Sequence, residues 1–235
     1  MRNLSHAGAW LLAAVAVCAA ESAYAQMPPG GPGGPGGPGG PGSMPSTLTA
    51  DPLPVPPDKA AQKAFAAGVK SLNKAKEQEA AAANAANPDK KAAAIEKVQD
   101  AYNRALDQFT EALSQKGDLF DAWNDVGYVH LKLGAFAESV DDYDHALALK
   151  ADSYDAIEHR GEALLALDRV NAVEPAYMDL YSHDRARADR LMTLMQQWVA
   201  RHRTAAGGVR PADIDSFERW VAEHNDAAQQ AAAAH

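Results

Sequence analysis

The chain has 235 residues and carries 22 Lys and Arg against 31 Asp and Glu, a formal net charge of −9 at pH 7. Binding to nucleic-acid phosphates requires a basic surface, so this balance argues against nucleic acid as the main partner. Aromatic residues make up 7% of the chain and alanine is abundant. This composition favours closely packed helices, because alanine has the highest helix propensity.

Residues 1–25 have the features of a secretory signal peptide. Arg2 precedes the apolar stretch 7–20, and the Ala-Tyr-Ala of residues 23–25 is the small-x-small pattern of a cleavage site. The apolar stretch is shorter than the roughly 20 residues that span a bilayer, and a retained N-terminal anchor is the alternative interpretation. We expect cleavage after Ala25, export to the periplasm of a Gram-negative bacterium, and no membrane span in the mature chain.

The only cysteine, Cys18, lies within this signal. The mature chain would therefore have no disulfide, no thiolate nucleophile and no cysteine metal ligand. None of the eight histidines falls in a spacing typical of a metal site, and the only glycine tract lies outside the expected folded part. We therefore expect no catalytic residue, no metal and no cofactor, and a protein that is not an enzyme.

Residues 26–57 are expected to form a disordered Gly/Pro-rich linker. Residues 26–42 read QMPPGGPGGPGGPGGPG, and this three-residue glycine pattern suggests collagen, but the triplets are too few for a triple helix. A flexible tether is the better interpretation, and the Pro-rich residues 43–57 extend it.

Two long helices are expected over residues 59–119. Asp58 is placed to cap the first helix, which runs to about residue 85. The Asn87-Pro88 pair breaks it, because the residue before a proline avoids the helical region. The second helix runs to about residue 114, and Gly117 is expected to end it. Apolar residues at helical spacing mark the buried face of the first helix: Phe65, Val69 and Leu72.

The segment 120–153 reads FDAWNDVGYVHLKLGAFAESVDDYDHALALKADS. Large and small residues recur in it at the positions of a two-helix repeat: Trp123, Val126, Gly127, His130, Ser139, Tyr143 and Ala146. This unit resembles a tetratricopeptide repeat (TPR), with mild departures at Ser139, where alanine is commoner, and at Ala151, where proline is commoner. The resemblance implies an antiparallel helix pair that turns at Gly134.

A shift by the full length of this unit identifies a degraded copy of it over residues 154–187. Gly161 and Tyr177 then repeat Gly127 and Tyr143. In this copy a capping pattern at Asn171 and Glu174 would start the second helix late and place Pro175 in its first turn. The opposite shift identifies a stretched unit over residues 59–119, whose second helix matches at three positions: Ala105, Phe109 and Ala112.

The three units together predict a TPR-like repeat domain over residues 58–187. Residues 188–235 are expected to form C-terminal capping helices and a frayed tail. An amphipathic helix is predicted over residues 182–203, and another begins at Pro211. The predicted fold class is all-α, a short TPR-like α-solenoid of antiparallel helix pairs with C-terminal capping helices.

The TPR resemblance implies a protein or peptide partner that lies in a groove lined by the first helix of each unit. By family position, seven residues would face this groove: Asp121, Asn124, Tyr128, Lys132, Asp155, Glu158 and Glu162. The lysine clamp that chaperone-type TPR domains use for a C-terminal carboxylate is missing, because Asn124 stands where the clamp would want lysine. Glu158 and Glu162 would in addition repel a carboxylate.

Residues 118–162 carry 11 Asp and Glu against 3 Lys and Arg. This excess either forms a solvated outer face or steers a basic segment into the groove. Residues 169–210 carry 7 Arg against 4 Asp and Glu, which would either pair with a neighbouring molecule or form i,i+4 surface pairs.

Three functional hypotheses follow from these patterns. The first is an exported scaffold or adaptor that binds a basic or neutral segment of a partner. The second is a self-associating structural module of the cell envelope. The third is a metal-binding or enzymatic protein that uses the scattered histidines and aspartates. The sequence indicates neither the partner nor the oligomeric state.

Overall fold

The structure, a computed structural model, describes residues 57–85, 87–204 and 208–233. The expected signal peptide lies outside these residues, and so does the expected linker apart from Pro57. None of the described helices is long and apolar enough to cross a membrane.

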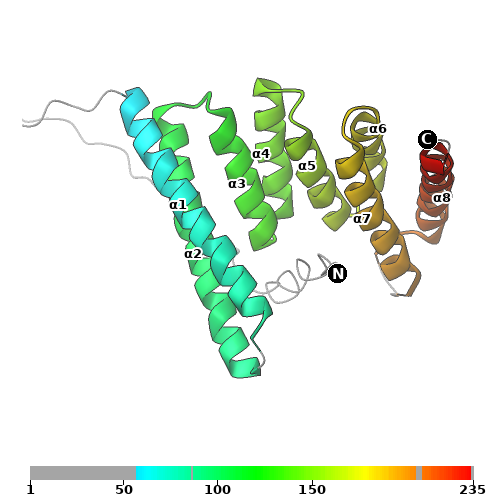
Figure 1. Cartoon of the computed structure of the whole chain (residues 1–235), viewed down its shortest axis with the longest axis horizontal. Coiled ribbons are helices and arrows are strands. Elements are labelled where there is room, and N and C mark those ends of the chain that lie inside the picture. Colours follow the sequence, from blue (N-terminus) through cyan, green and yellow to red (C-terminus); the bar gives the residue numbers. More distant parts are fainter. Residues whose placement is uncertain (1–56, 86, 205–207, 234–235) are drawn as a thin grey trace, which may run out of the picture.

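The described residues form an all-α array without strands. Its elements are α1 (Pro57–Ala83), α2 (Pro88–Gln115), α3 (Phe120–Leu133), α4 (Phe136–Leu149), α5 (Tyr154–Ala166), the 3₁₀ helix η2 (Val170–Ala172), α6 (Val173–His183), α7 (Arg185–Thr204) and α8 (Pro211–Ala233). Each α-helix packs against the next along the chain, and the array runs from α1 at one edge to α8 at the other (Figure 1). In addition α3 packs on α5, and α5 packs on α7. This TPR-like solenoid of antiparallel helix pairs confirms the predicted fold class.

The first helix pair is much longer than the pairs that follow it. Helices α1 and α2 have 27 and 28 residues, whereas α3 and α4 have 14 each. The additional residues correspond to about 20 Å of helix, and this end of the pair projects beyond the neighbouring helices (Figure 1). The Asn87 side chain caps α2 by accepting hydrogen bonds from the N–H groups of Asp89 and Lys90. The chain therefore breaks where Asn87-Pro88 predicts.

Two predicted helix ends are wrong in detail. Helix α1 already includes Pro57, so Asp58 does not cap it and instead lies in its first turn. A carboxylate there still interacts favourably with the positive end of the helix dipole. Helix α2 ends at Gln115 because Lys116 adopts an extended conformation. Gly117 is not among the described residues with positive φ, unlike Gly134, whose φ of 81° ends α3.

Glycine lets the two helices of a pair approach closely. A Cβ added at Gly127 in α3 would lie 3.1 Å from the ring of Tyr143 in α4. A Cβ added at Gly68 in α1 would lie 2.5 Å from the ring of Phe109 in α2. The stretched first unit therefore uses the same glycine–aromatic packing as the best unit, although its two residues are farther apart in the sequence.

Ser139, a departure from the TPR pattern, has a structural role. Its side chain is fully buried, and its hydroxyl donates a hydrogen bond of 2.8 Å to the backbone carbonyl of Gly127. The bond satisfies the buried hydroxyl and joins α4 to α3 at the residue where they approach most closely.

The degraded unit departs from this packing. Gly161 of α5 contacts Leu191 of α7, and no atom of Tyr177 is among its nearest neighbours. The Tyr177 ring instead contacts Tyr181 and, edge-on, Trp220 of α8. Helix α7 has thus taken the place beside Gly161 that a regular repeat would give to its own second helix.

The entry into α6 follows the prediction only in part. Pro175 does lie in the first turn of α6, where a missing N–H is tolerated. However, η2 precedes the helix, and the N-cap is Ala172 without a side-chain hydrogen bond, so the capping role of Asn171 and Glu174 is wrong. The helix predicted over residues 182–203 is also divided, because α6 ends at His183 and the Asp184 carboxylate accepts a hydrogen bond from the N–H of Arg187 in α7.

The C-terminal helices are fixed by Trp198, which is fully buried in α7. Its indole Nε1–H donates a hydrogen bond of 2.9 Å to the carboxylate of Asp168. Asp168 has φ of 58°, and among the described residues other than glycine it alone has a positive φ. Aspartate tolerates this left-handed conformation better than most residues. The turn after α5 therefore presents its carboxylate to the core of α7 and α8.

The glycine–aromatic packing predicts different costs for two glycine substitutions. Gly68→Ala should lower the free energy of unfolding by about 1–2 kcal/mol, because the clash with Phe109 outweighs the gain in helix propensity. Gly117→Ala should change it by less than about 0.5 kcal/mol, since the nearest atom to its Cβ would be 3.9 Å away. Urea unfolding followed by circular dichroism measures both values. Equal stability of the two variants would contradict this packing.

Candidate functional site

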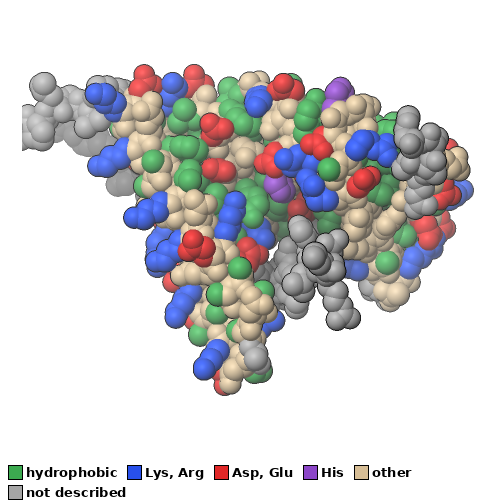
Figure 2. All heavy atoms as spheres, in the orientation of Figure 1, with side chains coloured by type: hydrophobic (Ala, Val, Ile, Leu, Met, Phe, Trp, Pro, Cys, Tyr) green, Lys and Arg blue, Asp and Glu red, His purple; other side chains and the backbone are tan. Residues whose placement is uncertain are grey.

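One side of the solenoid is formed by α1, α3, α5 and α7 and is turned towards the viewer in Figures 1 and 2. Acidic, basic and histidine side chains gather over its middle, among apolar ones (Figure 2). We call this side the first-helix face. It is defined by Lys76, Glu79, Asp121, Asn124, Asp125, Tyr128, Lys132, Asp155, Glu158, His159, Glu162, Arg187 and Arg190.

Glu79 joins three helices at one end of this face. Its carboxylate accepts a hydrogen bond of 2.6 Å from the hydroxyl of Tyr102 in α2 and forms an ion pair of 2.6 Å with Lys132 in α3. The Lys132 and Glu79 side chains are 14% and 22% exposed, so this pair is well shielded from water. Lys132 therefore already has a partner in α1.

Tyr128 lies at the centre of the face and contacts side chains from two other helices. The ammonium of Lys76 in α1 lies 4.4 Å from the centre of the Tyr128 ring, a cation–π distance. On the α5 side, the His159 ring meets Tyr128 edge-on at 5.4 Å between centroids. His159 also stacks on Tyr143 of α4, at 6.1 Å.

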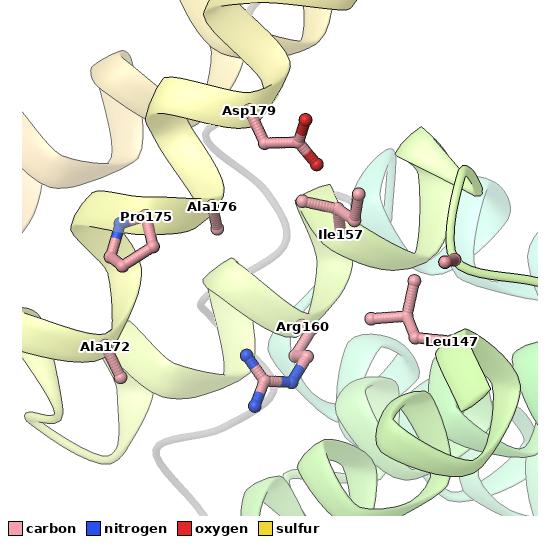
Figure 3. A pocket seen from close by; sticks show the side chains of 8 residues that line it. Leu147, Ile157, Arg160, Ala172, Pro175, Ala176 and Asp179 are labelled. Atoms are coloured by element: carbon pink, nitrogen blue, oxygen red, sulfur yellow. The ribbon is translucent and has the colours of Figure 1, made fainter.

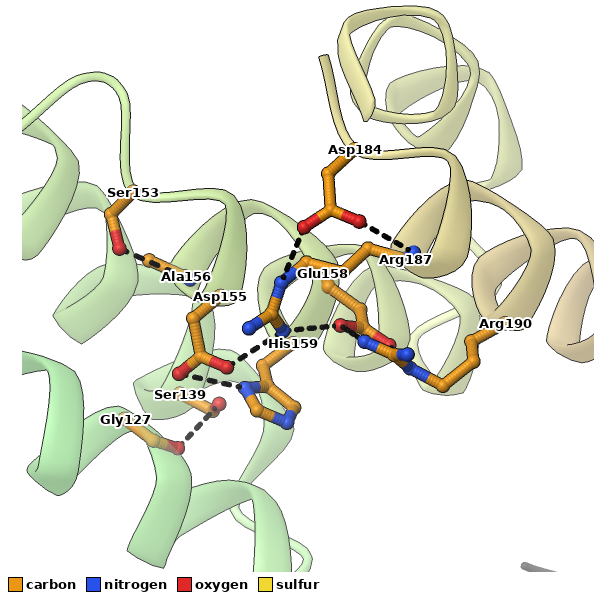
Figure 4. A network of polar contacts seen from close by, with 10 residues as sticks. All are labelled: Gly127, Ser139, Ser153, Asp155, Ala156, Glu158, His159, Asp184, Arg187 and Arg190. Carbon is orange, nitrogen blue, oxygen red and sulfur yellow. Dashed lines mark hydrogen bonds and ion pairs between the residues drawn. The ribbon is translucent and has the colours of Figure 1, made fainter. Parts of the chain in front are cut away.

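Glu158 joins α5 to α7 and is almost completely buried, with its side chain 8% exposed. Its two carboxylate oxygens accept hydrogen bonds of 2.6 and 2.8 Å from Arg190 and of 2.7 Å from Arg187 (Figure 4). Arg187 also pairs with Asp155, at 2.8 Å, and with Asp184, at 3.2 Å. Arginine matches carboxylate geometry well enough to keep such a charge buried.

This arrangement changes the interpretation of the charge pattern. Arg187 and Arg190, which belong to the arginine-rich stretch 169–210, pair with the acidic α5 of the same chain. Glu158 was predicted to face a ligand, but its oxygens are fully engaged by these two guanidinium groups. It therefore acts as a structural link between α5 and α7.

Three polar atoms beside these pairs have no hydrogen-bond partner among the described residues. They are the amide oxygen of Asn124, the hydroxyl of Tyr143 and Nδ1 of His159, and all three are shielded from solvent. His159 Nδ1 lies 3.7 Å from the carboxylate of Asp155, an ion-pair distance longer than a hydrogen bond. Buried polar atoms normally have partners, and outside this group the described residues leave only Gln78 Oε1 and the Tyr177 hydroxyl in the same state.

Burial also alters the ionisation of this region. It raises the pKa of Asp125 to about 6, and the nearby Asp121 and Asp155 add to the shift while Lys76 opposes it. Burial raises the pKa of Glu162 to about 7, against the opposing effect of Lys132. Burial lowers the pKa of His159, so its ring is neutral at pH 7 and one ring nitrogen can accept a hydrogen bond.

Four of the predicted residues lie in one cluster with His159: Asn124, Tyr128, Asp155 and Glu162. Asp121 is exposed at the start of α3, and Lys132 and Glu158 are engaged in ion pairs within the chain. Asp125, His159, Tyr143 and Lys76 belong to the same cluster but were not predicted. Asp125 and His159 occupy equivalent positions of successive repeats, one position after Asn124 and Glu158, so the repeat spacing itself could have identified them.

A shallow pocket of about 290 Å³ lies elsewhere, between α4, α5 and α6 (Figure 3). Its walls are largely aliphatic, with Leu147, Ile157 and Pro175 among the lining residues. The nearest cation, Arg160, is already paired with Asp144 at 2.6 Å. The pocket therefore offers little directed polar chemistry in comparison with the first-helix face.

Among the described residues, no group of three or more His, Cys, Asp or Glu side chains could hold a metal ion. The described helices form a TPR-like helical-repeat array. No family model matches the chain, and no curated protein matches it. Among solved structures it is similar to the TPR domain of OM64 from Arabidopsis, with 13% identity, a TM-score of 0.38, and coverage of 72% of this chain and 98% of that one.

The link between α5 and α7 gives a test of its structural role. Glu158→Gln should lower the free energy of unfolding by about 2–4 kcal/mol, because two partly buried guanidinium groups lose their shared counter-charge. The matched control Asp141→Asn, at an exposed position of α4, should change it by less than about 0.5 kcal/mol. Chemical denaturation at pH 7 measures the difference. A Glu158→Gln variant as stable as the control would show that the carboxylate is dispensable for folding.

Proposed function

We propose that this chain is a protein-interaction scaffold that binds an extended segment of a partner protein along the first-helix face. Successive helices of a repeat array align their side chains into one continuous surface, which suits an extended ligand. In this chain α3 packs on α5 and α5 on α7, so their exposed side chains form such a surface.

The observation that carries the proposal is the set of unpartnered atoms on Asn124, Tyr143 and His159. An amide oxygen accepts hydrogen bonds, a hydroxyl can both accept and donate, and Nδ1 of a neutral imidazole accepts or donates according to the tautomer. A peptide main chain supplies one N–H donor at nearly every residue, and each such donor would otherwise need a partner. A bound segment that displaces the side chains covering these atoms would therefore satisfy atoms that the described part of the chain leaves without a partner.

The charge of the face favours a basic or neutral segment over an acidic one. Glu79 is already paired with Lys132, and Glu158 is paired with Arg187 and Arg190. Asp121, Asp125 and Glu162 have no ion pair within 4.0 Å in the described residues, and the charge of Lys76 only partly offsets the burial of Asp125. An acidic segment would meet these carboxylates without compensation.

We also propose that the chain acts after export. The support is the N-terminal pattern of Arg2, the apolar stretch 7–20 and the small residues 23 and 25. An exported adaptor would hold its partner outside the cytoplasm, in the periplasm of a Gram-negative bacterium.

Site-specific cross-linking in cells tests the binding face. A photoreactive amino acid at Asp121, exposed in α3, should cross-link to a partner protein, and the same amino acid at Asp141 in α4 should not. Peptides spanning the cross-linked segment should then bind the purified full chain. At pH 8, where the Glu162 carboxyl is ionised, Glu162→Gln should weaken binding of a basic peptide about fivefold or more. Cross-links of equal yield from both positions, or only to other copies of this chain, would contradict the proposal; the latter result would favour self-association.

The mass of the protein in cell fractions tests export. We expect a periplasmic species that begins at Gln26, because a signal peptidase would cleave after Ala25. Replacing Ala23 and Ala25 with bulky residues should block processing, whereas the same change at Ala13 and Ala14 should not. A membrane-bound protein that keeps residues 1–25 would instead support a retained anchor, and a cytoplasmic one would contradict export.

A further inference from the structure

The exposed side chain of Lys76 occupies a cation site on the first-helix face. Lys76 belongs to α1, and its ammonium lies 4.4 Å above the Tyr128 ring of α3. It also lies close enough to Asp125 to oppose the rise in that carboxyl's pKa. None of the ion pairs within 4.0 Å in the described residues includes Lys76. The chain's own lysine is therefore held by a ring face and by the charge of a nearby carboxylate, without a direct ion pair.

The surroundings of this ammonium are those of a cation-binding site. The rings of Tyr128, His159 and Tyr143 follow one another, with centroid distances of 5.4 and 6.1 Å. Asp125 of α3 and Asp155 of α5 add negative charge to this region, and of the two only Asp155 has an ion pair in the described residues, with Arg187 at 2.8 Å. Ring faces and carboxylates attract cations by the same electrostatic sign, and the attraction is stronger in a site shielded from water.

A second observation, independent of the acidic residues, also points to a ligand. Tyr143 is fully buried, yet its hydroxyl has no hydrogen-bond partner among the described residues. The Tyr143 ring stacks on His159 of the first-helix face, at 6.1 Å between centroids, so this side chain adjoins the site. The amide oxygen of Asn124, one residue before Asp125, is equally unpartnered.

The geometry favours a guanidinium over an ammonium. A guanidinium offers five N–H donors in a flat fork and no acceptor, which suits several acceptors arranged around one ring. Its plane also stacks on aromatic rings, and it pairs with a carboxylate through two parallel hydrogen bonds. An ammonium is a compact and strongly hydrated charge that loses more hydration in such a site.

We propose that an arginine side chain of the bound segment displaces Lys76 and takes its place over Tyr128, where it pairs with the carboxylate of Asp125. This inference rests on the proposed function, since it assigns one side-chain site within the peptide-binding face. Lys76 then acts as an internal competitor that keeps the site shielded until a partner arrives.

Matched peptides that differ in one residue test this site. The probes are the capped heptapeptides Ala-Ser-Ala-X-Ala-Ser-Ala, in which X is arginine, citrulline or lysine, titrated into the full chain at pH 7.5 and followed by NMR. Citrulline keeps the shape of arginine but is neutral. We expect the arginine peptide to bind at least tenfold more tightly than the citrulline peptide, with lysine between them.

Three variants connect this preference to the named residues. Asp125→Asn should weaken binding of the arginine peptide about tenfold and leave the affinity for the citrulline peptide unchanged. Lys76→Ala should increase the affinity for the arginine peptide about threefold or more, because it removes the competing ammonium group. Asp141→Asn, the matched control on α4, should change neither value, and circular dichroism verifies that each variant is folded.

The same site predicts a pH dependence. Asp125 faces Lys76 of α1, Asp121 of its own helix and Asp155 of α5, and burial raises its pKa to about 6. Its carboxylate is therefore ionised above pH 6 and largely neutral below it. Affinity for the arginine peptide should increase between pH 5 and pH 7.5, and this increase should be much smaller in Asp125→Asn.

Equal affinity for arginine and citrulline peptides, or tighter binding by the lysine peptide, would overturn the arginine site. Failure of all three peptides to bind would overturn it as well. Neither result decides the proposed function, which the cross-links from Asp121 test separately. If the Lys76→Ala variant bound the arginine peptide more weakly, Lys76 would contribute to binding, and its role as a competitor would be overturned.

Discussion

The close approach of paired helices at glycine is the constraint on which the rest of the structure depends. Gly68 and Gly127 each leave room for an aromatic ring of the following helix, Phe109 and Tyr143. A ring that lies flat against backbone excludes water from the whole crossing and fixes the distance between the two helices. Because the same contact recurs in successive pairs, the pairs stack in one direction and direct their first helices to one side.

Polar groups on that side are paired near α7, whereas some near α3 have no partner among the described residues, and this difference follows from the packing. Tyr143 fills the space beside Gly127 and stacks on His159, and its buried hydroxyl has no partner among the described residues. Further along, Gly161 receives Leu191 of α7 in place of an aromatic ring. Helix α7 can then reach α5, and Arg187 and Arg190 neutralise Glu158. Ion pairs therefore join α5 to α7, whereas polar atoms of Asn124, Tyr143 and His159 near the middle of the array have no partner among the described residues.

The same division separates residues that stabilise the fold from residues that can serve a ligand. A buried carboxylate held by two arginines gains nothing from a third cation, so Glu158 is a structural residue. Asp125 has no ion pair within 4.0 Å among the described residues, only the opposing charge of Lys76, and burial already makes its own charge unfavourable. A bound cation would stabilise the charged form of Asp125 and so offset the cost of its burial. Ionisable groups with shifted pKa values often lie at binding sites for this reason.

Local patterns in the sequence determine much of this protein. The repeat spacing of glycine, aromatic and small residues predicts the helix pairs and the fold class, because each pair needs the same close crossing. Asn87-Pro88 predicts the break between the long helices for a purely local reason, since proline restricts the residue before it. The family positions also identify Asn124, Tyr128 and Asp155 as neighbours on one face.

Only the tertiary structure decides which of those residues have partners. Glu158 and Glu162 have the same charge and lie one helical turn apart in α5, yet α7 brings two arginines to the first and none to the second. Lys76 reaches Tyr128 from α1, a helix that α2 separates from α3 along the chain. Such pairings depend on where separate helices meet, and helical periodicity records only which face of each helix is buried.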